Sequence, residues 1–329
     1  MAETATVADS AELAHLVRSG FIESRHAGSV VVVNPEGDVV FSLGNPSAPV
    51  FPRSAMKPFQ VVAMMSSGLE IDGAYAAIAT ASHNGSAAHV ALVRDLLARA
   101  GLTEDALQCA KDMPGDKAMR NDVIKRDGGA ERIYHCCSGK HAAMLLTCVQ
   151  NEWPIDSYMD PEHPLQKRVV EVIDRLTGEK ISVSAVDGCG APVHAMSLIA
   201  LARGIRAITT SSATSPFGMY RAGAVLTQAM LANPWVVGAH GEPDTLIMER
   251  LGFVAKAGYE GVFIVSTPDG TTAAVKVLDG NLRAAPAIAL QALVRAGVLE
   301  QARLDALLPD LDMTVYGGGN PVGELRTSF

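Results

Sequence analysis

The chain has 329 residues, of which 48% are hydrophobic, so it can bury a large core without disulfide bonds. Its formal net charge is −8 and it contains no run of lysine and arginine, which argues against nucleic acid as a partner and favours a small-molecule substrate. No apolar stretch approaches the roughly 20 residues of a membrane-spanning helix, so we expect no membrane insertion. The first residues lack the positive segment of a secretory signal, and we expect a cytoplasmic protein.

The predicted elements begin with a β-hairpin, because residues 29–33 and 39–43 are rich in β-branched side chains and residues 34–38 between them are typical of a turn. Helical patterns follow at residues 89–100, 142–152, 164–176, 193–203 and 220–231. A second hairpin is predicted from strands at 261–266 and 271–277, and a helix at 285–296 follows it.

Strands at both ends of the chain and helices between them predict an α+β fold in which the two hairpins share one antiparallel sheet. The sequence has no linker rich in proline, glycine or serine. We therefore expect residues 1–329 to form a single domain with two lobes. The sheet lobe is predicted at about 17–50 and 253–329, and the helical lobe at about 51–252.

Three short motifs stand in a fixed order: Ser54-Ala-Met-Lys57, Ser82-His-Asn84 and Lys256-Ala-Gly258. Each is common by chance. Together, in this order, they are typical of serine β-lactamases, penicillin-binding proteins and related amide-cleaving enzymes. The sequence thus favours a serine acyl-transfer enzyme.

The first motif offers a nucleophile and a base. Pro58 is tolerated only in the first turn of a helix, so Ser54 is expected near a helix N-terminus. Lys57 can act as a base if burial or a nearby positive charge, such as Lys256, lowers its pKa. The alternative is that Ser54 only caps a helix and Lys57 is solvated.

The other two motifs are expected to complete the site. Ser82 and Asn84 can relay a proton and hold a substrate amide, although the same residues would also suit a turn before a helix. Gly258 permits a close backbone approach by a ligand. By analogy with β-lactamases, the backbone amides of Ser54 and Tyr259 would form an oxyanion hole.

Longer strings carry a family resemblance. They are FPRSAMKPFQ at 51–60, ASHNG at 81–85, CSGKHAAML at 137–145, VDGCGAP at 186–192 and KAGYEGV at 256–262. Together they resemble the L-asparaginase II family of the rhizobial, thermolabile type, from about residue 17 to the C-terminus. That family is similar in fold to serine β-lactamases and glutaminases.

The resemblance implies hydrolysis of L-asparagine to L-aspartate and ammonia by two serine–lysine pairs. These would be Ser54 with Lys57 and Ser82 with Lys256, with Ser54 as the nucleophile. It also implies a homodimer.

The resemblance further implies a zinc site beside the active site, with Cys137, Lys140 and Cys189 as ligands. The alternative is that the two cysteines behave as small buried hydrophobes. Arg53 is the natural candidate for the substrate carboxylate, because a guanidinium can pair with it through two hydrogen bonds. His141 is a second candidate for substrate binding, or else a structural histidine.

Four positions depart from the family pattern: Cys136, Ser86, Tyr259 and Glu242. They leave two other functions open. One is a β-lactamase-like serine peptidase or esterase that acts on another acyl substrate. The other is a relative that binds an amino acid and has lost catalytic power.

Overall fold

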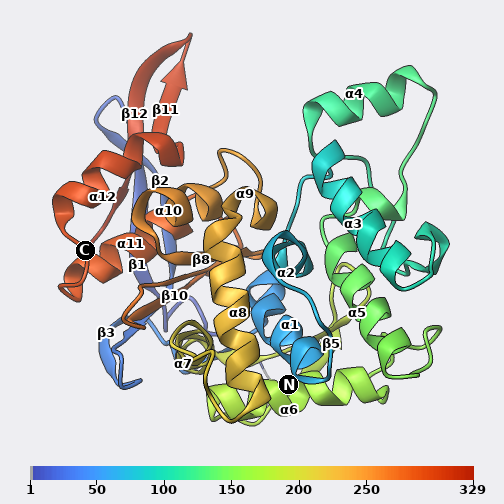
Figure 1. Ribbon diagram of the computed structural model, residues 1–329. Coiled ribbons are helices and arrows are strands. Elements are labelled where there is room, and N and C mark those ends of the chain that lie inside the picture. Colours follow the sequence, from blue (N-terminus) through green and yellow to red (C-terminus); the bar gives the residue numbers. More distant parts are fainter. Residues whose placement is uncertain (1–2) are drawn as a thin grey trace.

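The computed structural model describes residues 3–329, and its centre is one antiparallel sheet of eight strands (Figure 1). The strand order is β11-β12-β1-β2-β10-β9-β8, and β3 pairs with β2 outside this path. The strands are β1 (Ala11–Arg18), β2 (Phe21–Val33), β3 (Val39–Leu43), β8 (Val254–Gly258), β9 (Val262–Ser266), β10 (Thr272–Val277), β11 (Thr314–Gly317) and β12 (Asn320–Thr327). The predicted α+β fold is confirmed.

Both predicted hairpins are present and they meet in this sheet. β2 and β3 pair with Val30 opposite Leu43, and β9 and β10 pair with Thr272 opposite Ser266. β2 then pairs with β10, with Val30 opposite Val275. The expectation that the two hairpins share one sheet is therefore confirmed.

Helices cover both faces of the sheet. All five residues of β9 are buried, and successive side chains of a strand point to opposite faces, so neither face of β9 is open to solvent. Helices α7 (Leu198–Thr209) and α11 (Ala285–Arg295) both pack against β10. Burial on two sides explains why these strands read as continuous apolar runs.

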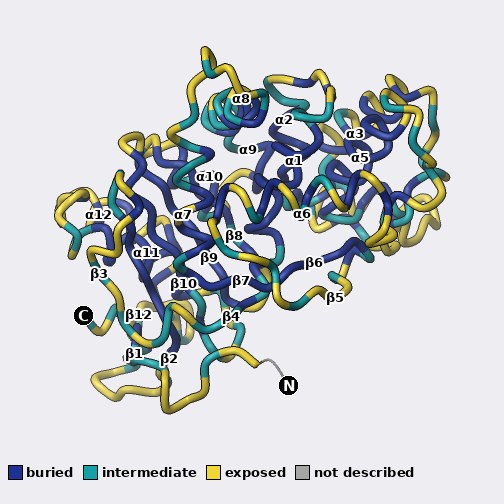
Figure 2. The backbone as a smooth tube through the Cα atoms, turned by 90° about the horizontal axis from the view of Figure 1, so that it is seen from below, coloured by how far each residue is buried: buried dark blue, intermediate teal, exposed yellow. Residues whose placement is uncertain are grey.

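Most of the remaining helices lie together around α1 (Lys57–Ser66), whose first eight residues are all buried, whereas α12 packs on α11. Figure 2 shows the buried part of the tube in α1, α2, α5 and the central strands, with exposed residues mainly in loops. The other helices are α2 (Gly73–Thr80), α3 (Ala87–Arg99), α4 (Lys117–Lys125), α5 (Ser138–Gln150), α6 (Pro164–Thr177), α8 (Gly218–Ala232), α9 (Pro234–Val237), α10 (Pro243–Leu251) and α12 (Gln301–Leu307). Within residues 3–329, no helix combines the length and apolar character needed to cross a membrane.

The predicted helix at 193–203 is partly wrong. Its first residues form the short strands β6 (Pro192–His194) and β7 (Met196–Ser197), which pair with β5 (Ser184–Val186) and β4 (Pro49–Val50). The helix begins only at Leu198, because the Ser197 hydroxyl accepts the Ala200 amide at 3.0 Å and caps it.

Two further features of the sheet differ from the sequence expectations. The Lys256 motif directly precedes strand β9, and it lies itself on a further strand, the edge strand β8, which the pattern did not identify. The sheet also contains Ala11–Arg18, which the pattern did not identify as a strand. The lobe boundaries stay a prediction, and α7, from the predicted helical lobe, packs on the sheet.

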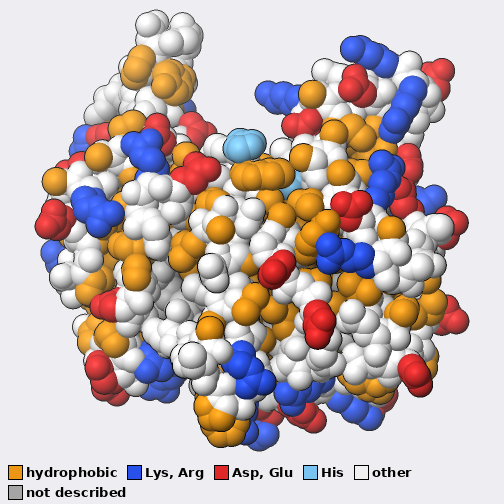
Figure 3. All heavy atoms as spheres, in the orientation of Figure 1, with side chains coloured by type: hydrophobic (Ala, Val, Ile, Leu, Met, Phe, Trp, Pro, Cys, Tyr) orange, Lys and Arg blue, Asp and Glu red, His pale blue; other side chains and the backbone are white. Residues whose placement is uncertain are grey.

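The surface is hollowed between two projections, the β11–β12 hairpin and the segment that carries α4 (Figure 3). Residues from α4, the loop after α2 and strand β8 come together on this side of the molecule to line a cavity.

Candidate active site

Ser54 lies in a short 3₁₀ turn, Arg53–Met56, directly before α1. Pro58 occupies the first turn of α1, where its missing amide hydrogen costs nothing, and this fixes the helix start next to Ser54 as predicted. The Ser54 side chain is 3% exposed and lines a cavity of about 410 Å³. Its hydroxyl has no hydrogen-bond partner among residues 3–329, so it is free to meet a ligand.

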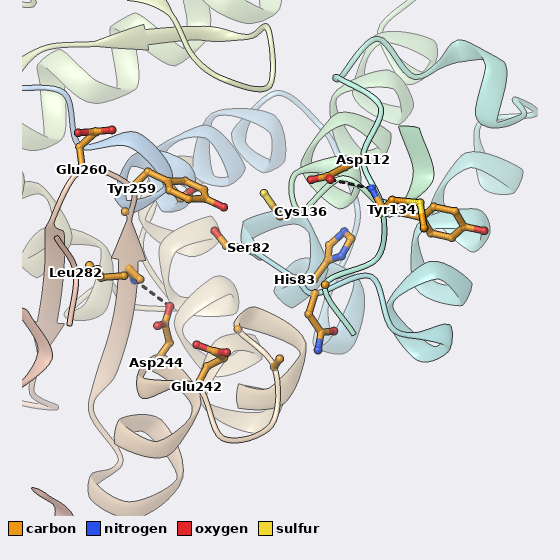
Figure 4. A pocket seen from close by; sticks show the side chains of 18 of the residues that line it. Ser82, His83, Asp112, Tyr134, Cys136, Glu242, Asp244, Tyr259, Glu260 and Leu282 are labelled. Atoms are coloured by element: carbon orange, nitrogen blue, oxygen red, sulfur yellow. Dashed lines mark hydrogen bonds between the residues drawn. The ribbon is translucent and has the colours of Figure 1, made fainter. Parts of the chain in front are cut away.

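Ser82 lies in the loop between α2 and α3 and lines the same cavity (Figure 4). Its Oγ accepts hydrogen bonds from Lys57 Nζ at 3.1 Å and from Lys256 Nζ at 3.0 Å. The two lysines therefore meet at one serine oxygen. In the described part of the chain Lys57 makes no hydrogen bond to Ser54, although sequence spacing suggested that pair.

Lys256 is held by a buried carboxylate. Its Nζ lies 3.3 Å from Asp244 Oδ2, and that oxygen also accepts the Ala257 amide at 2.9 Å. The exposed fractions of the two side chains are 0% and 5%. Burial lowers the pKa of Lys256, Asp244 opposes this, and the nearby charge of Lys57 lowers it further. A lysine with a lowered pKa gives up its proton more readily than an ordinary lysine.

Gly258 brings strand β8 against the turn that carries Ser54. A Cβ atom at this position would lie 2.3 Å from the Pro52 carbonyl oxygen, so no other residue fits without moving the backbone. The close approach expected for a ligand is thus made by the chain itself. As a result Ser54 lines one cavity together with Gly258 and Tyr259, although more than 200 residues of the chain separate Ser54 from the other two.

More acidic than basic side chains line the cavity. Its charged lining residues are Asp112, Arg120, Glu242, Asp244 and Glu260. Of the carboxylates, only Asp244 pairs with a lysine among residues 3–329. Sequence patterns did not single out Arg120, which lies on α4 and has no motif around it. The cavity therefore offers groups for both a substrate ammonium and a substrate carboxylate.

Of the predicted substrate-binding residues, Asn84, Gly258 and Tyr259 line the cavity and Arg53 and His141 do not. The Arg53 backbone has φ +53°, and its Nε lies 2.6 Å from Asp187 Oδ1, so its guanidinium is already paired. His141 Nδ1 shares a hydrogen bond with the Tyr158 hydroxyl at 2.7 Å. Burial lowers the pKa of His141 to about 4. Both residues belong to a second polar cluster, in which Asp187 links Arg53 to Cys189.

That cluster contains the predicted zinc ligands. Cys137 and Cys189 are buried, and Lys140 Nζ donates to Cys189 Sγ at 3.1 Å. Burial opposes the charge of Lys140, but the two thiolates raise its pKa above the ordinary value. His141 Nε2 is buried and has no hydrogen-bond partner in the described residues. Two thiols with nitrogen donors beside them are a donor set that suits zinc.

The model of one protein family, described as L-asparaginase II, matches residues 14–327. The chain belongs to this family. Membership supports an amide hydrolase of the asparaginase type, in agreement with the resemblance carried by the motifs. Among curated proteins, the sequence has no match.

Three solved structures are similar at low identity. A β-lactamase from Mycobacterium bovis is 15% identical with a TM-score of 0.43, and the alignment covers 83% of this chain and 95% of that one. Mglu in its glutamate form is 13% identical with a TM-score of 0.44, over 83% of this chain and 61% of that one. Mglu in its native form is 16% identical with a TM-score of 0.43, and the alignment covers 82% of this chain and 64% of that one. Similarities of this size say nothing about substrate.

Proposed function

We propose that this protein hydrolyses L-asparagine to L-aspartate and ammonia through an acyl-enzyme on serine. The observation that carries the proposal is the meeting of Lys57 and Lys256 at Ser82 Oγ, in the cavity that also contains the free hydroxyl of Ser54. Two amines and two hydroxyls in one partly buried space can accept and return protons without a histidine.

In the acylation step the Ser54 oxygen attacks the side-chain amide carbon of the substrate. Its proton passes to the lysine pair, with Ser82 Oγ as the relay, because Ser82 contacts both amines. Hydrogen bonds of this kind are often long before substrate binds, so the missing contact between Lys57 and Ser54 does not remove Ser54 as the nucleophile. The carbon–nitrogen bond then breaks, and ammonia leaves with a proton from a lysine.

In the deacylation step a water molecule attacks the ester carbonyl and gives a proton to the same relay. The ester bond breaks, the Ser54 oxygen regains its proton, and aspartate leaves. The backbone amides of Ser54 and Tyr259, which flank the cavity, are the proposed donors to the oxygen anion in both steps.

Charged groups on the cavity wall are proposed to hold the two ends of the substrate. Glu242 is the partner for the ammonium, because it lines the cavity and forms no ion pair within residues 3–329. Arg120 takes the role that the sequence suggested for Arg53, since Arg53 is paired with Asp187. An amino-acid amide would then carry its two charges between α4 and α10.

Cys137, Lys140 and Cys189 are proposed to hold zinc. The metal would keep the two buried thiols ionised and would fix the start of α5 next to the cavity. The cytoplasmic location and the homodimer remain predictions.

Ammonia release from L-asparagine tests the proposal, with L-glutamine and a chromogenic ester as parallel substrates. Ser54→Ala is expected to abolish ammonia release, and acid quenching of the wild type is expected to trap an aspartyl adduct on the peptide that contains Ser54. An adduct on the Ser82 peptide would reassign the nucleophile. Ester turnover without ammonia release would indicate the esterase function instead.

A further inference from the structure

The turn before α5 gathers three metal-binding side chains, of which the proposed function uses only Cys137. His135, Cys136 and Cys137 place one ligand atom each within 4.8 Å of the other two. Cys137 is the residue that precedes the first turn of α5, so the positive end of a 13-residue helix faces the thiols and favours their anionic form. These are consecutive residues, so their relative positions depend little on the rest of the fold.

The spacing of these atoms is close to that of ligands on one tetrahedral ion. Zinc–sulfur bonds of about 2.3 Å at a tetrahedral angle hold two sulfurs about 3.8 Å apart. The Cys136 and Cys137 sulfurs are 3.8 Å apart. A zinc–nitrogen bond of about 2.0 Å would place a ring nitrogen about 3.5 Å from a sulfur. His135 Nδ1 lies 4.0 Å from Cys136 Sγ, so a small rotation of the ring is enough.

The ring nitrogen is available at a modest cost. His135 Nδ1 accepts the backbone amide of Cys137 at 3.0 Å, and a metal ion would replace this single hydrogen bond. His135 and Cys136 are both half-buried, so an ion can reach them from solvent.

Cys136 also lines the catalytic cavity. Figure 4 shows its sulfur beside Ser82 and the ring of Tyr259. An ion on Cys136 would therefore lie beside the space where a substrate amide meets the serines.

We propose that His135, Cys136 and Cys137 bind a thiophilic divalent ion at the cavity wall, and that the bound ion blocks the cavity. This site differs from the set formed by Cys137, Lys140 and Cys189. The two sets share the Cys137 thiolate, so an ion that occupies one set competes with an ion on the other.

Cobalt(II) is a suitable probe, because thiolate ligands give it a charge-transfer absorption. The titration is made in the Cys189→Ser background, which removes the other ligand set. This variant is expected to bind cobalt. Adding Cys136→Ser is expected to weaken binding at least about tenfold, which is the loss typical even of an outer partner of a metal site. Adding Cys148→Ser, a buried cysteine on α5 away from the cavity, is expected to change affinity less than about twofold.

Equal affinity in the variants with and without Cys136 would overturn the proposal, and so would a Cys189→Ser protein that folds and binds no cobalt. If Cys189→Ser does not fold, alkylation of Cys136 in the wild type replaces the titration. Zinc is expected to slow its reaction with iodoacetamide at least about tenfold, as followed by peptide mapping. An unchanged alkylation rate would overturn the proposal. None of these measurements depends on asparaginase activity.

Discussion

Two buried lysines, Lys256 and Lys140, differ in their partners. Lys256 contacts the carboxylate of Asp244 and the hydroxyl of Ser82, and shares that hydroxyl with Lys57. Lys140 instead contacts the sulfur of Cys189. Burial favours the neutral amine in both cases.

The charged groups around each lysine decide whether its pKa falls or rises. Near Lys256, burial and a second positive charge outweigh one carboxylate, and the pKa of the amine falls. Near Lys140, burial is outweighed by the thiolates of Cys189 and Cys137 and the carboxylate of Asp187, and the pKa rises. The first arrangement suits proton transfer, and the second suits a permanent charge or a metal site.

The largest expected effect separates these roles. Lys256→Met is expected to reduce kcat for ammonia release by about 10²–10⁴-fold, which is the usual contribution of a general base. Lys140→Met is expected to lower the free energy of unfolding, because it leaves two buried thiols without their cation. Its loss of kcat is expected to be smaller than that of Lys256→Met. Steady-state kinetics and thermal unfolding of both variants check this. Equal loss of kcat in the two variants, with both still folded, would remove the distinction.

The Lys256 variant leaves the Asp244 carboxylate buried without its ion partner, so poor folding could imitate a loss of chemistry. Combining Lys256→Met with Asp244→Asn removes that charge. The double variant is expected to unfold at a higher temperature than Lys256→Met alone and to remain inactive.

Asp244→Asn alone tests how the Asp244 carboxylate affects the pKa of Lys256. Asp244 raises the pKa of Lys256 against the effect of burial, so its removal is expected to lower that pKa further. A neutral lysine is the active base, and kcat rises with pH as the amine loses its proton. The rising limb of the kcat profile should therefore move to lower pH in Asp244→Asn. A limb that stays in place would show that Lys256 does not control it.

Glu242→Gln tests how the cavity around Lys256 recognises the ammonium of the substrate. The variant is expected to raise the KM for L-asparagine about fivefold, since a partly exposed ion pair contributes up to about 1 kcal/mol. The KM for β-alaninamide, which keeps the ammonium and lacks the carboxylate, should rise equally. Succinamic acid, which lacks the ammonium, should be unaffected. Glu249→Gln, an exposed residue of α10 outside the cavity lining, is the matched control, since α10 is the helix that directly follows Glu242.

The smallest effect is expected at Arg53, which pairs with Asp187. Arg53→Gln should change kcat/KM for L-asparagine less than about twofold and reduce the free energy of unfolding by at most about 1 kcal/mol. A tenfold rise in KM would instead restore Arg53 as the carboxylate partner that its position next to Ser54 suggested.

Local patterns were enough for much of the fold. The hairpins at β2–β3 and β9–β10 were predicted because turn residues and apolar strands stand side by side in the sequence. The short strands β6 and β7 were not predicted, because residues 192–197 include the small and apolar residues that also occur at the start of a helix. Strand β1 was missed because its partners, β2 and β12, lie on either side of it in space, and β12 is at the far end of the chain.

By itself the sequence determined the family, the three short motifs and the start of α1 next to Pro58, because each depends on neighbouring residues. Only the tertiary structure decided which groups meet. Lys57 reaches Ser82 instead of Ser54 since the loop after α2 lies above α1, and Arg53 turns to Asp187 since its backbone adopts a left-handed conformation. Contacts between distant segments depend on how the helices and the sheet pack, and no spacing along the chain records that packing.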